Sequence, residues 1–149
     1  MSITDMPRAP FVEIDSWALK SNWRTLAMLA PDARTGAAVK ADGYGLGGVI
    51  ASKALFGAGC RDFFVAWAEE GAEIREAMPG KNCRIFVLQG LDRHAARLCR
   101  DERLLPVLST PEDIELWTAG GEPEDGGLPG VAGLQLETCL LYTSPSPRD

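Results

Sequence analysis

The sequence lacks the segments that target a chain to a membrane. No apolar run reaches the roughly 18 residues that a transmembrane helix requires, and residues 1–10 lack the basic-then-apolar layout of a signal peptide. We therefore expect no membrane span and a location in the cytoplasm.

Basic charge, cysteine pairs and histidine are also scarce. The 15 Lys and Arg are outnumbered by 21 Asp and Glu, and the resulting net charge of −6 predicts no nucleic-acid partner, because it repels a phosphate backbone. The four cysteines (Cys60, Cys83, Cys99 and Cys139) form no C-x-x-C pair, and the single histidine is His94. This pattern predicts neither a metal site nor a disulfide framework, so we expect buried, reduced thiols and an exposed His94.

The composition is that of an ordinary globular protein. Hydrophobic residues make up 46% and charged residues 24% of 149 residues, enough to form the core of one domain. A complete eight-fold α/β barrel needs about 250 residues, so a likeness to such a protein would cover only part of it.

Strand-like and helix-like segments alternate along the chain. We expect strands at residues 11–14, 37–39, 63–66, 84–88, 104–108 and 131–136. We expect helices from Asp15 or Ser16 to Pro31, from Val49 to Phe56, from Ala68 to Met78, from Asp92 to Arg100 and from Thr110 to Gly120. The strands from residue 37 onward begin 20 to 27 residues apart, which is typical of βα units in a parallel sheet. Periodicity alone fits both a doubly wound sheet and an unfinished barrel.

One segment, between an expected strand and the following helix, combines residues suited to chemistry. Lys40 follows the apolar residues 37–39, and a partly buried amine can act uncharged, as a nucleophile or a base. Four glycines lie within residues 43–48, where they let the backbone approach a bulky anion, and Tyr44 adds a hydroxyl. An amine for an aldehyde, together with donors for a phosphate, predicts a pyridoxal-phosphate site.

Two other interpretations of this segment stay open. It could be a glycine-rich turn in which Lys40 extends into solvent. Alternatively, Gly43, Gly45 and Gly48 match the G-x-G-x-x-G pattern of a dinucleotide-dependent oxidoreductase, with Glu69 or Glu70 placed to meet a ribose. Residues 40–42 weaken the second alternative, because a dinucleotide fingerprint starts directly at the end of its strand. The Glu69–Glu70 pair itself is explained by a helix dipole and needs no catalytic role.

Residues 40–47, Lys-Ala-Asp-Gly-Tyr-Gly-Leu-Gly, resemble the cofactor-lysine signature of alanine racemases. Residues 12–15, 68–75, 85–88 and 135–138 resemble successive units of the same family, so the resemblance covers roughly residues 11–138.

The resemblance implies an α/β fold of a fold-type III pyridoxal-phosphate enzyme: about five parallel βα units of a partial (β/α)8 TIM-type barrel, followed in the family by a β-rich domain and active as a homodimer. By resemblance, Lys40 would bind pyridoxal 5'-phosphate as a Schiff base and act as one of two acid/base groups. Tyr44 would bind the cofactor phosphate, and Leu88 would pack near its ring. The reaction would interconvert L-alanine and D-alanine for peptidoglycan precursors. A non-catalytic pyridoxal-phosphate-binding barrel is the alternative.

Several parts of the family pattern are missing from this chain. The opposing acid/base, a tyrosine, lies in the family's C-terminal β domain, which we expect to be absent here, and an arginine expected soon after residue 138 is replaced. Residues 139–149 are rich in Ser and Pro, and we interpret them as a disordered, non-native tail. We therefore expect residues 1–138 to be an N-terminal part of the barrel that is inactive alone.

Overall fold

The computed structural model describes residues 12–119 and 131–136, in which helices and strands alternate. The helices are α1 (Ser16–Leu29), α2 (Lys40–Tyr44), α3 (Gly48–Ala58), α4 (Ala68–Ala77), α5 (Arg93–Asp101) and α6 (Pro111–Thr118). The strands are β1 (Ala37–Ala38), β2 (Asp62–Val65), β3 (Arg84–Val87), β4 (Leu105–Leu108) and β5 (Gly133–Leu134). From residue 37 onward, this order confirms the predicted βα units.

Local capping residues explain where three of the helices begin. Asp15, Asp92 and Thr110 each accept hydrogen bonds from backbone N–H groups of the first helical turn, at 2.7 to 3.1 Å. Such bonds satisfy donors that have no partner within the helix. Pro111 supports the start of α6 in the same way, because its fixed φ suits the first helical position and it has no N–H to satisfy.

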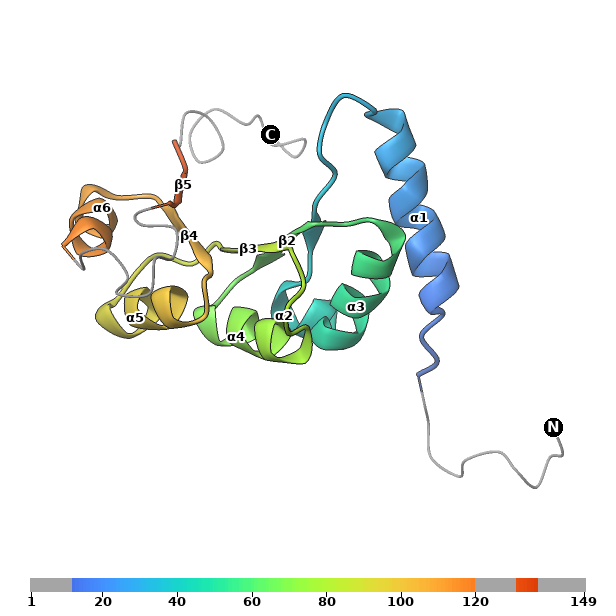
Figure 1. Cartoon of the computed structure of the whole chain (residues 1–149), viewed down its shortest axis with the longest axis horizontal. Coiled ribbons are helices and arrows are strands. Elements are labelled where there is room, and N and C mark those ends of the chain that lie inside the picture. Colours follow the sequence, from blue (N-terminus) through green and yellow to red (C-terminus); the bar gives the residue numbers. More distant parts are fainter. Residues whose placement is uncertain (1–11, 120–130, 137–149) are drawn as a thin grey trace, which may run out of the picture.

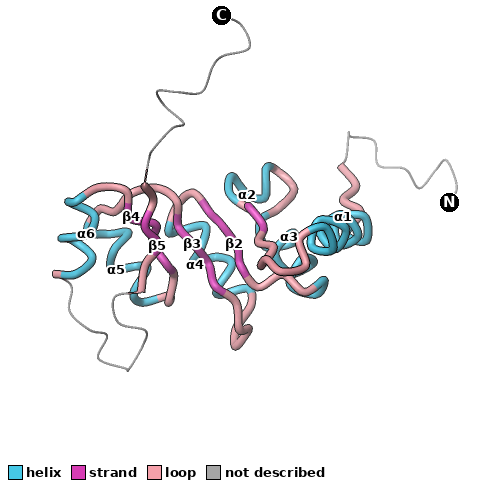
Figure 2. Tube along the Cα trace, turned by 90° about the horizontal axis from the view of Figure 1, so that it is seen from above, coloured by secondary structure: helices cyan, strands magenta, loops and turns pink. Residues whose placement is uncertain are grey.

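The sheet has the topology of a partial barrel. Its strands are parallel and follow the order β1-β2-β3-β4-β5, so each connection advances by one strand and the direction never reverses. Helices α3, α4 and α5 lie along one face, and the view from above looks onto the strands (Figures 1 and 2). A doubly wound sheet reverses its strand order and carries helices on both faces. The arrangement therefore confirms the α/β barrel type over the doubly wound alternative.

The hydrophobic core lies between the sheet and the helices. Phe63 and Val65 of β2 and Ile85 and Val87 of β3 are fully buried on the helix-covered face. Helical residues complete this core, among them Ala51, Leu55, Ile74, Met78, Ala96, Cys99 and Trp117. Because alternate strand positions point to opposite faces, the intervening residues line the other face of the sheet.

That other face is apolar but open among the described residues. Phe64 and Phe86 are half-buried neighbours on it, and their rings stack with centroids 4.9 Å apart. Ala38 pairs with Phe64 in the parallel register and is exposed. In a barrel, this row of residues faces the interior.

An ion-pair network fixes the amino-terminal ends of the strands. Asp62, at the start of β2, is buried and receives two hydrogen bonds from Arg84 at 2.7 and 3.0 Å and two from Arg34 at 2.9 and 3.2 Å. The Arg84 guanidinium lowers the pKa of this carboxyl group, burial acts in the opposite direction, and Arg34 adds to the lowering. The network joins β2 to β3 and to the segment that precedes β1.

We expect Asp62→Asn to lower the free energy of unfolding by about 1 to 2 kcal/mol at pH 7, because hydrogen bonds to a charged group are lost while the two partly exposed arginines regain water. The folded pKa of Asp62 lies below the unfolded value of about 3.9, so its contribution is present above that pH and disappears as pH falls through the folded pKa. Urea unfolding of both proteins between pH 7 and pH 2 measures this. A difference between them that stays constant down to the lowest pH would contradict it.

Some predicted boundaries were wrong. Residues 12–14 belong to no strand, although the alternation of residues 11–14 predicted one; four residues of alternation do not supply a strand partner. Helix α1 ends at Leu29, and α3 begins at Gly48 and passes through Gly57 to end at Ala58. Within the predicted strand 131–136, only Gly133 and Leu134 pair with β4.

The remaining expectations concern cysteines, the membrane and the tail. Cys60, Cys83 and Cys99 are buried and free, as predicted, and burial raises the pKa of the Cys99 thiol to about 12. In the two described ranges, no helix has the length and apolar character to cross a membrane. Residues 139–149, which include Cys139, and the predicted helix end at Gly120 lie outside the described residues.

Candidate functional site

Lys40 lies at the carboxyl-terminal edge of the sheet. Val39 is buried directly after β1, and its N–H donates to the carbonyl of Phe64 at 2.8 Å. Ala38 is exposed on the open face and Val39 is buried, and Lys40 then begins the short helix α2. Lys40 is half-buried. Parallel sheets place ligands at this edge, because it combines strand ends with the starts of helices.

The segment that follows Lys40 is a turn of left-handed helix. Ala41, Asp42, Gly43 and Tyr44 have φ values of 52, 50, 63 and 57°. The Gly43 N–H donates to Val39 at 2.8 Å and the Gly45 N–H donates to Ala41 at 3.0 Å. A left-handed conformation costs about 1 to 2 kcal/mol for each non-glycine residue, so the surrounding structure must hold this turn in place. Strain of this kind concentrates at functional sites.

Two of the glycines allow the turn to close onto α3. A Cβ atom on Gly43 would lie 3.2 Å from the backbone nitrogen of Gly48, so a side chain there would crowd the start of α3. The carboxylate of Asp42 accepts a hydrogen bond from the Gly48 N–H at 2.6 Å. The turn and the first residue of α3 are therefore packed as one unit.

Glu70 is the residue that the sequence interpretation undervalued. One oxygen of its carboxylate accepts from Ala41 N–H at 2.6 Å and from Asp42 N–H at 3.4 Å. The other oxygen accepts from Ala66 N–H at 2.8 Å and from Trp67 N–H at 3.1 Å. Glu70 is the third residue of α4, the position from which a capping box predicts a hydrogen bond to the N–H of Trp67. The bond to Ala41 spans 29 residues and leaves no local sequence signal.

The predicted cofactor residues share one edge of the sheet but do not form one cluster. Tyr44 closes the left-handed turn and is 63% exposed, which leaves it open to a ligand. Leu88 directly follows β3, is half-buried, and its N–H donates to Val65 at 3.0 Å. Leu88 follows β3 and Lys40 follows β1, and β2 lies between these two strands, so their ends are separated by two strand spacings, about 10 Å.

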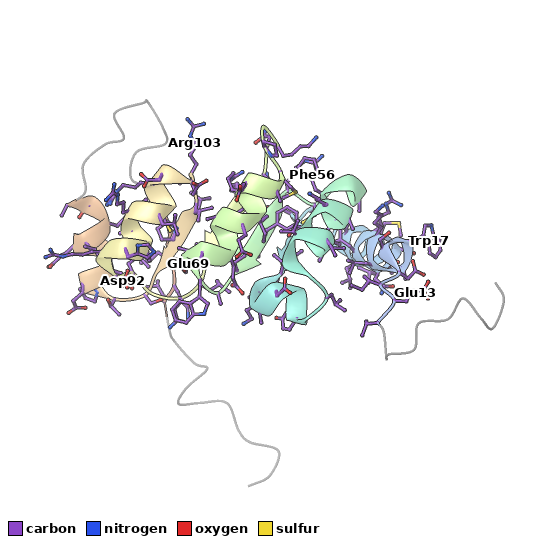
Figure 3. All side chains as sticks on the ribbon, turned by 90° about the horizontal axis from the view of Figure 1, so that it is seen from below. Glu13, Trp17, Phe56, Glu69, Asp92 and Arg103 are labelled. Atoms are coloured by element: carbon purple, nitrogen blue, oxygen red, sulfur yellow. The ribbon has the colours of Figure 1, made fainter. Side chains whose placement is uncertain are left out.

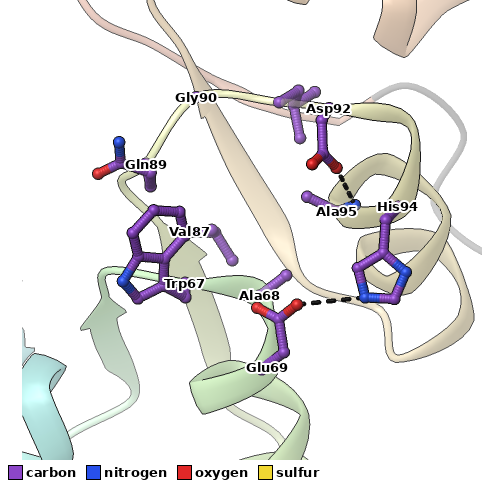
Figure 4. Close-up of a pocket in the computed structure, with 10 residues that line it drawn as sticks. Trp67, Ala68, Glu69, Val87, Gln89, Gly90, Asp92, His94 and Ala95 are labelled. Carbon is purple, nitrogen blue, oxygen red and sulfur yellow. Dashed lines mark hydrogen bonds and ion pairs between the residues drawn. The ribbon is translucent and has the colours of Figure 1, made fainter.

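A hollow of about 330 Å³ lies beside this edge, between the starts of α4 and α5 (Figure 4). Trp67, directly before α4, and Glu69, within α4, line one side, and Gln89 and His94 line it from the next unit. His94 is exposed, as predicted, and its Nε2 lies 3.2 Å from Glu69. Figure 3 shows Glu69 and Asp92 along one long edge of the molecule, and Phe56 and Arg103 along the opposite edge. Lys40, Tyr44 and Leu88 do not line the hollow.

These contacts favour the lysine interpretation over a dinucleotide site. Four residues separate the end of β1 from Gly43, which lies inside the left-handed turn. The carboxylate of Glu70 already accepts four backbone hydrogen bonds, and Glu69 pairs with His94, so neither is poised to bind a ribose. The five strands within residues 12–119 and 131–136 also show no reversal of strand order, the feature at which dinucleotides bind.

Comparison with known proteins gives consistent results. Among curated proteins, the chain is 42% identical over 136 residues to the catabolic alanine racemase of Agrobacterium fabrum, covering 91% of this chain and 34% of that protein. It is 40% identical over 143 residues to an alanine racemase of Methylobacterium sp., covering 96% of this chain and 38% of that protein. The chain thus spans little more than a third of the length of these relatives.

A solved structure and a family model agree with these relatives. The alanine racemase of Bartonella henselae, solved with covalently bound pyridoxal phosphate, superposes with a TM-score of 0.67 at 37% identity, covering 71% of this chain and 30% of that one. Residues 14–130 match the model of the alanine racemase N-terminal domain. The chain therefore belongs to the alanine racemase family.

Proposed function

We propose that this chain supplies the cofactor-lysine part of a pyridoxal-phosphate-dependent alanine racemase. The proposed reaction interconverts L-alanine and D-alanine, in the cytoplasm, for peptidoglycan precursors, and the whole enzyme acts as a homodimer. Family membership, the names of the relatives and the bound pyridoxal phosphate of one solved relative support this proposal. The observation that carries it is the presentation of Lys40 on a strained left-handed turn at the carboxyl edge of the sheet.

The residues at this edge fit the chemistry of pyridoxal phosphate. Lys40 provides an amine for the aldehyde, and the exposed hydroxyl of Tyr44 is available to the phosphate. Leu88, half-buried after β3, would supply an apolar side chain for packing near the ring. When bound, the cofactor supplies a ring that delocalises the charge left on the substrate after proton removal.

The proposed role of Lys40 is to hold the cofactor and to move a proton at the substrate α-carbon through its ε-nitrogen. Burial of Val39 and partial burial of Lys40 limit the number of orientations of the lysine stem. Racemisation needs a second acid/base group on the opposite face of the substrate. By resemblance to the family, that second group is a tyrosine of the C-terminal β domain, and this chain spans little more than a third of the length of its relatives. The chain alone should therefore not racemise alanine at a measurable rate.

Covalent labelling tests the proposal. The purified chain is incubated with pyridoxal phosphate, reduced with borohydride and digested, and the modified peptide is mapped by mass spectrometry. The expected result is saturable labelling of Lys40, with no interconversion of L- and D-alanine before reduction. Labelling spread evenly over exposed lysines, or saturable binding of NAD without labelling at Lys40, would refute the proposed site.

A further inference from the structure

The carboxylate of Glu70 joins two neighbouring βα connections. Its four hydrogen bonds run to the turn after Lys40 and to the junction of β2 with α4. We call residues 41–44 the lysine turn. A second hydrogen bond, from the Gly48 N–H to the Asp42 carboxylate, also holds this turn, but it joins the turn only to the start of α3. Among the described residues, the side-chain hydrogen bonds of Glu70 tie the backbone next to Lys40 to the connection that follows the adjacent strand.

Asp113 occupies the same position on α6 and provides a comparison. It accepts from Ser109 N–H at 2.9 Å and Thr110 N–H at 3.1 Å, at the junction of β4 with α6, and from Leu91 N–H at 3.0 Å, in the preceding connection. Burial acts to raise the pKa of Asp113, but these backbone donors lower it overall. A carboxylate that bridges two neighbouring βα connections therefore occurs at both Glu70 and Asp113, and of these two bridges only that of Glu70 reaches the lysine turn.

We propose that Glu70 is a positioning residue for Lys40. This inference rests on the proposed function, since it concerns how the cofactor lysine is held. The left-handed conformation of Ala41 and Asp42 is intrinsically unfavourable, and their N–H groups face the carboxylate of Glu70. Without that acceptor, the turn can relax toward ordinary backbone angles and carry Lys40 away from the edge of the sheet.

Two substitutions remove the bridge to different extents. In Glu70→Gln, the side chain keeps one oxygen, so its NH2 group must face N–H donors on one side of the bridge. In Glu70→Ala, both oxygens are lost, so neither connection keeps its acceptor. Asp113→Asn is the matched control, because it weakens the same kind of carboxylate bridge at a place that does not contact Lys40.

The experiment uses the full chain and three measurements: amide hydrogen exchange of Ala41 and Asp42, the rate at which pyridoxal phosphate and borohydride label Lys40, and the midpoint of unfolding. Both Glu70 variants should label Lys40 about tenfold more slowly, the effect of losing a charge-assisted hydrogen bond, and should exchange the two amides faster. Asp113→Asn should label Lys40 within about twofold of the wild-type rate even where its unfolding midpoint falls equally.

Three outcomes overturn one proposal or the other. Wild-type labelling and exchange rates in folded Glu70→Ala would refute the positioning role. Equal slowing in Asp113→Asn would also refute it, because general loosening of the fold would then explain the effect. A wild-type chain that is not labelled at Lys40 would refute the proposed function, whereas the exchange of Ala41 and Asp42 would still decide whether Glu70 holds the turn.

Discussion

Lys40→Ala should abolish the specific covalent capture of pyridoxal phosphate, leaving only background labelling of other exposed lysines. Lys40→Arg should fail equally, although it keeps the positive charge. Arginine stays protonated at any accessible pH and cannot attack an aldehyde, whereas a lysine amine can lose its proton and react. Borohydride reduction followed by peptide mapping measures the labelling, and circular dichroism confirms that each variant is folded.

The matched control for these variants is Lys53→Ala. Lys53 is exposed on α3, a short distance along the chain from the lysine turn, and the proposal gives it no part in the site. Its removal should leave the labelling of Lys40 at the wild-type level. If Lys40→Arg were still labelled saturably at one position, that other lysine would be the site and the assignment of Lys40 would be wrong.

Features set by local residues could be predicted from the sequence. Asp92 and Thr110 cap their helices through side chains only a few residues away, so their positions alone indicated where α5 and α6 begin. The buried strands β2 and β3 were recognisable because both carry β-branched and aromatic residues between turn signals. Lys40 was proposed as the cofactor lysine from local sequence in the same way, since apolar residues precede it and glycines follow it, and its role stays a prediction.

Features that depend on distant residues could not be predicted in this way. The left-handed conformation of Ala41 and Asp42 runs against the preference of both residues, and the contact that holds it comes from Glu70, 28 and 29 residues later. From its position, Glu70 was interpreted as a partner of the helix dipole. That interpretation accounts for its bond to Trp67 at the start of the helix, but it did not predict the bond to the lysine turn. The network around Asp62 was missed for the same reason, because Arg34 and Arg84 meet it only in the folded sheet.

Phe63→Ala should destabilise the chain by about 3 to 5 kcal/mol, the cost of removing a fully buried aromatic ring and leaving a cavity. Domains of this size are typically stable by about 5 to 15 kcal/mol, so the variant should be close to unfolding. Urea unfolding followed by circular dichroism measures the loss.

Phe64→Ala is the control for this prediction, because the neighbouring ring lies on the open face of the same strand. Phe64 is half-buried and stacks on Phe86, so its removal should cost about 1 to 2 kcal/mol. Equal losses for the two variants would mean that both faces of β2 are covered in this chain, contrary to the open face described here. Because β2 carries the carbonyls that bind Val39 and Leu88, Phe63→Ala should also slow the labelling of Lys40, and Phe64→Ala should slow it less.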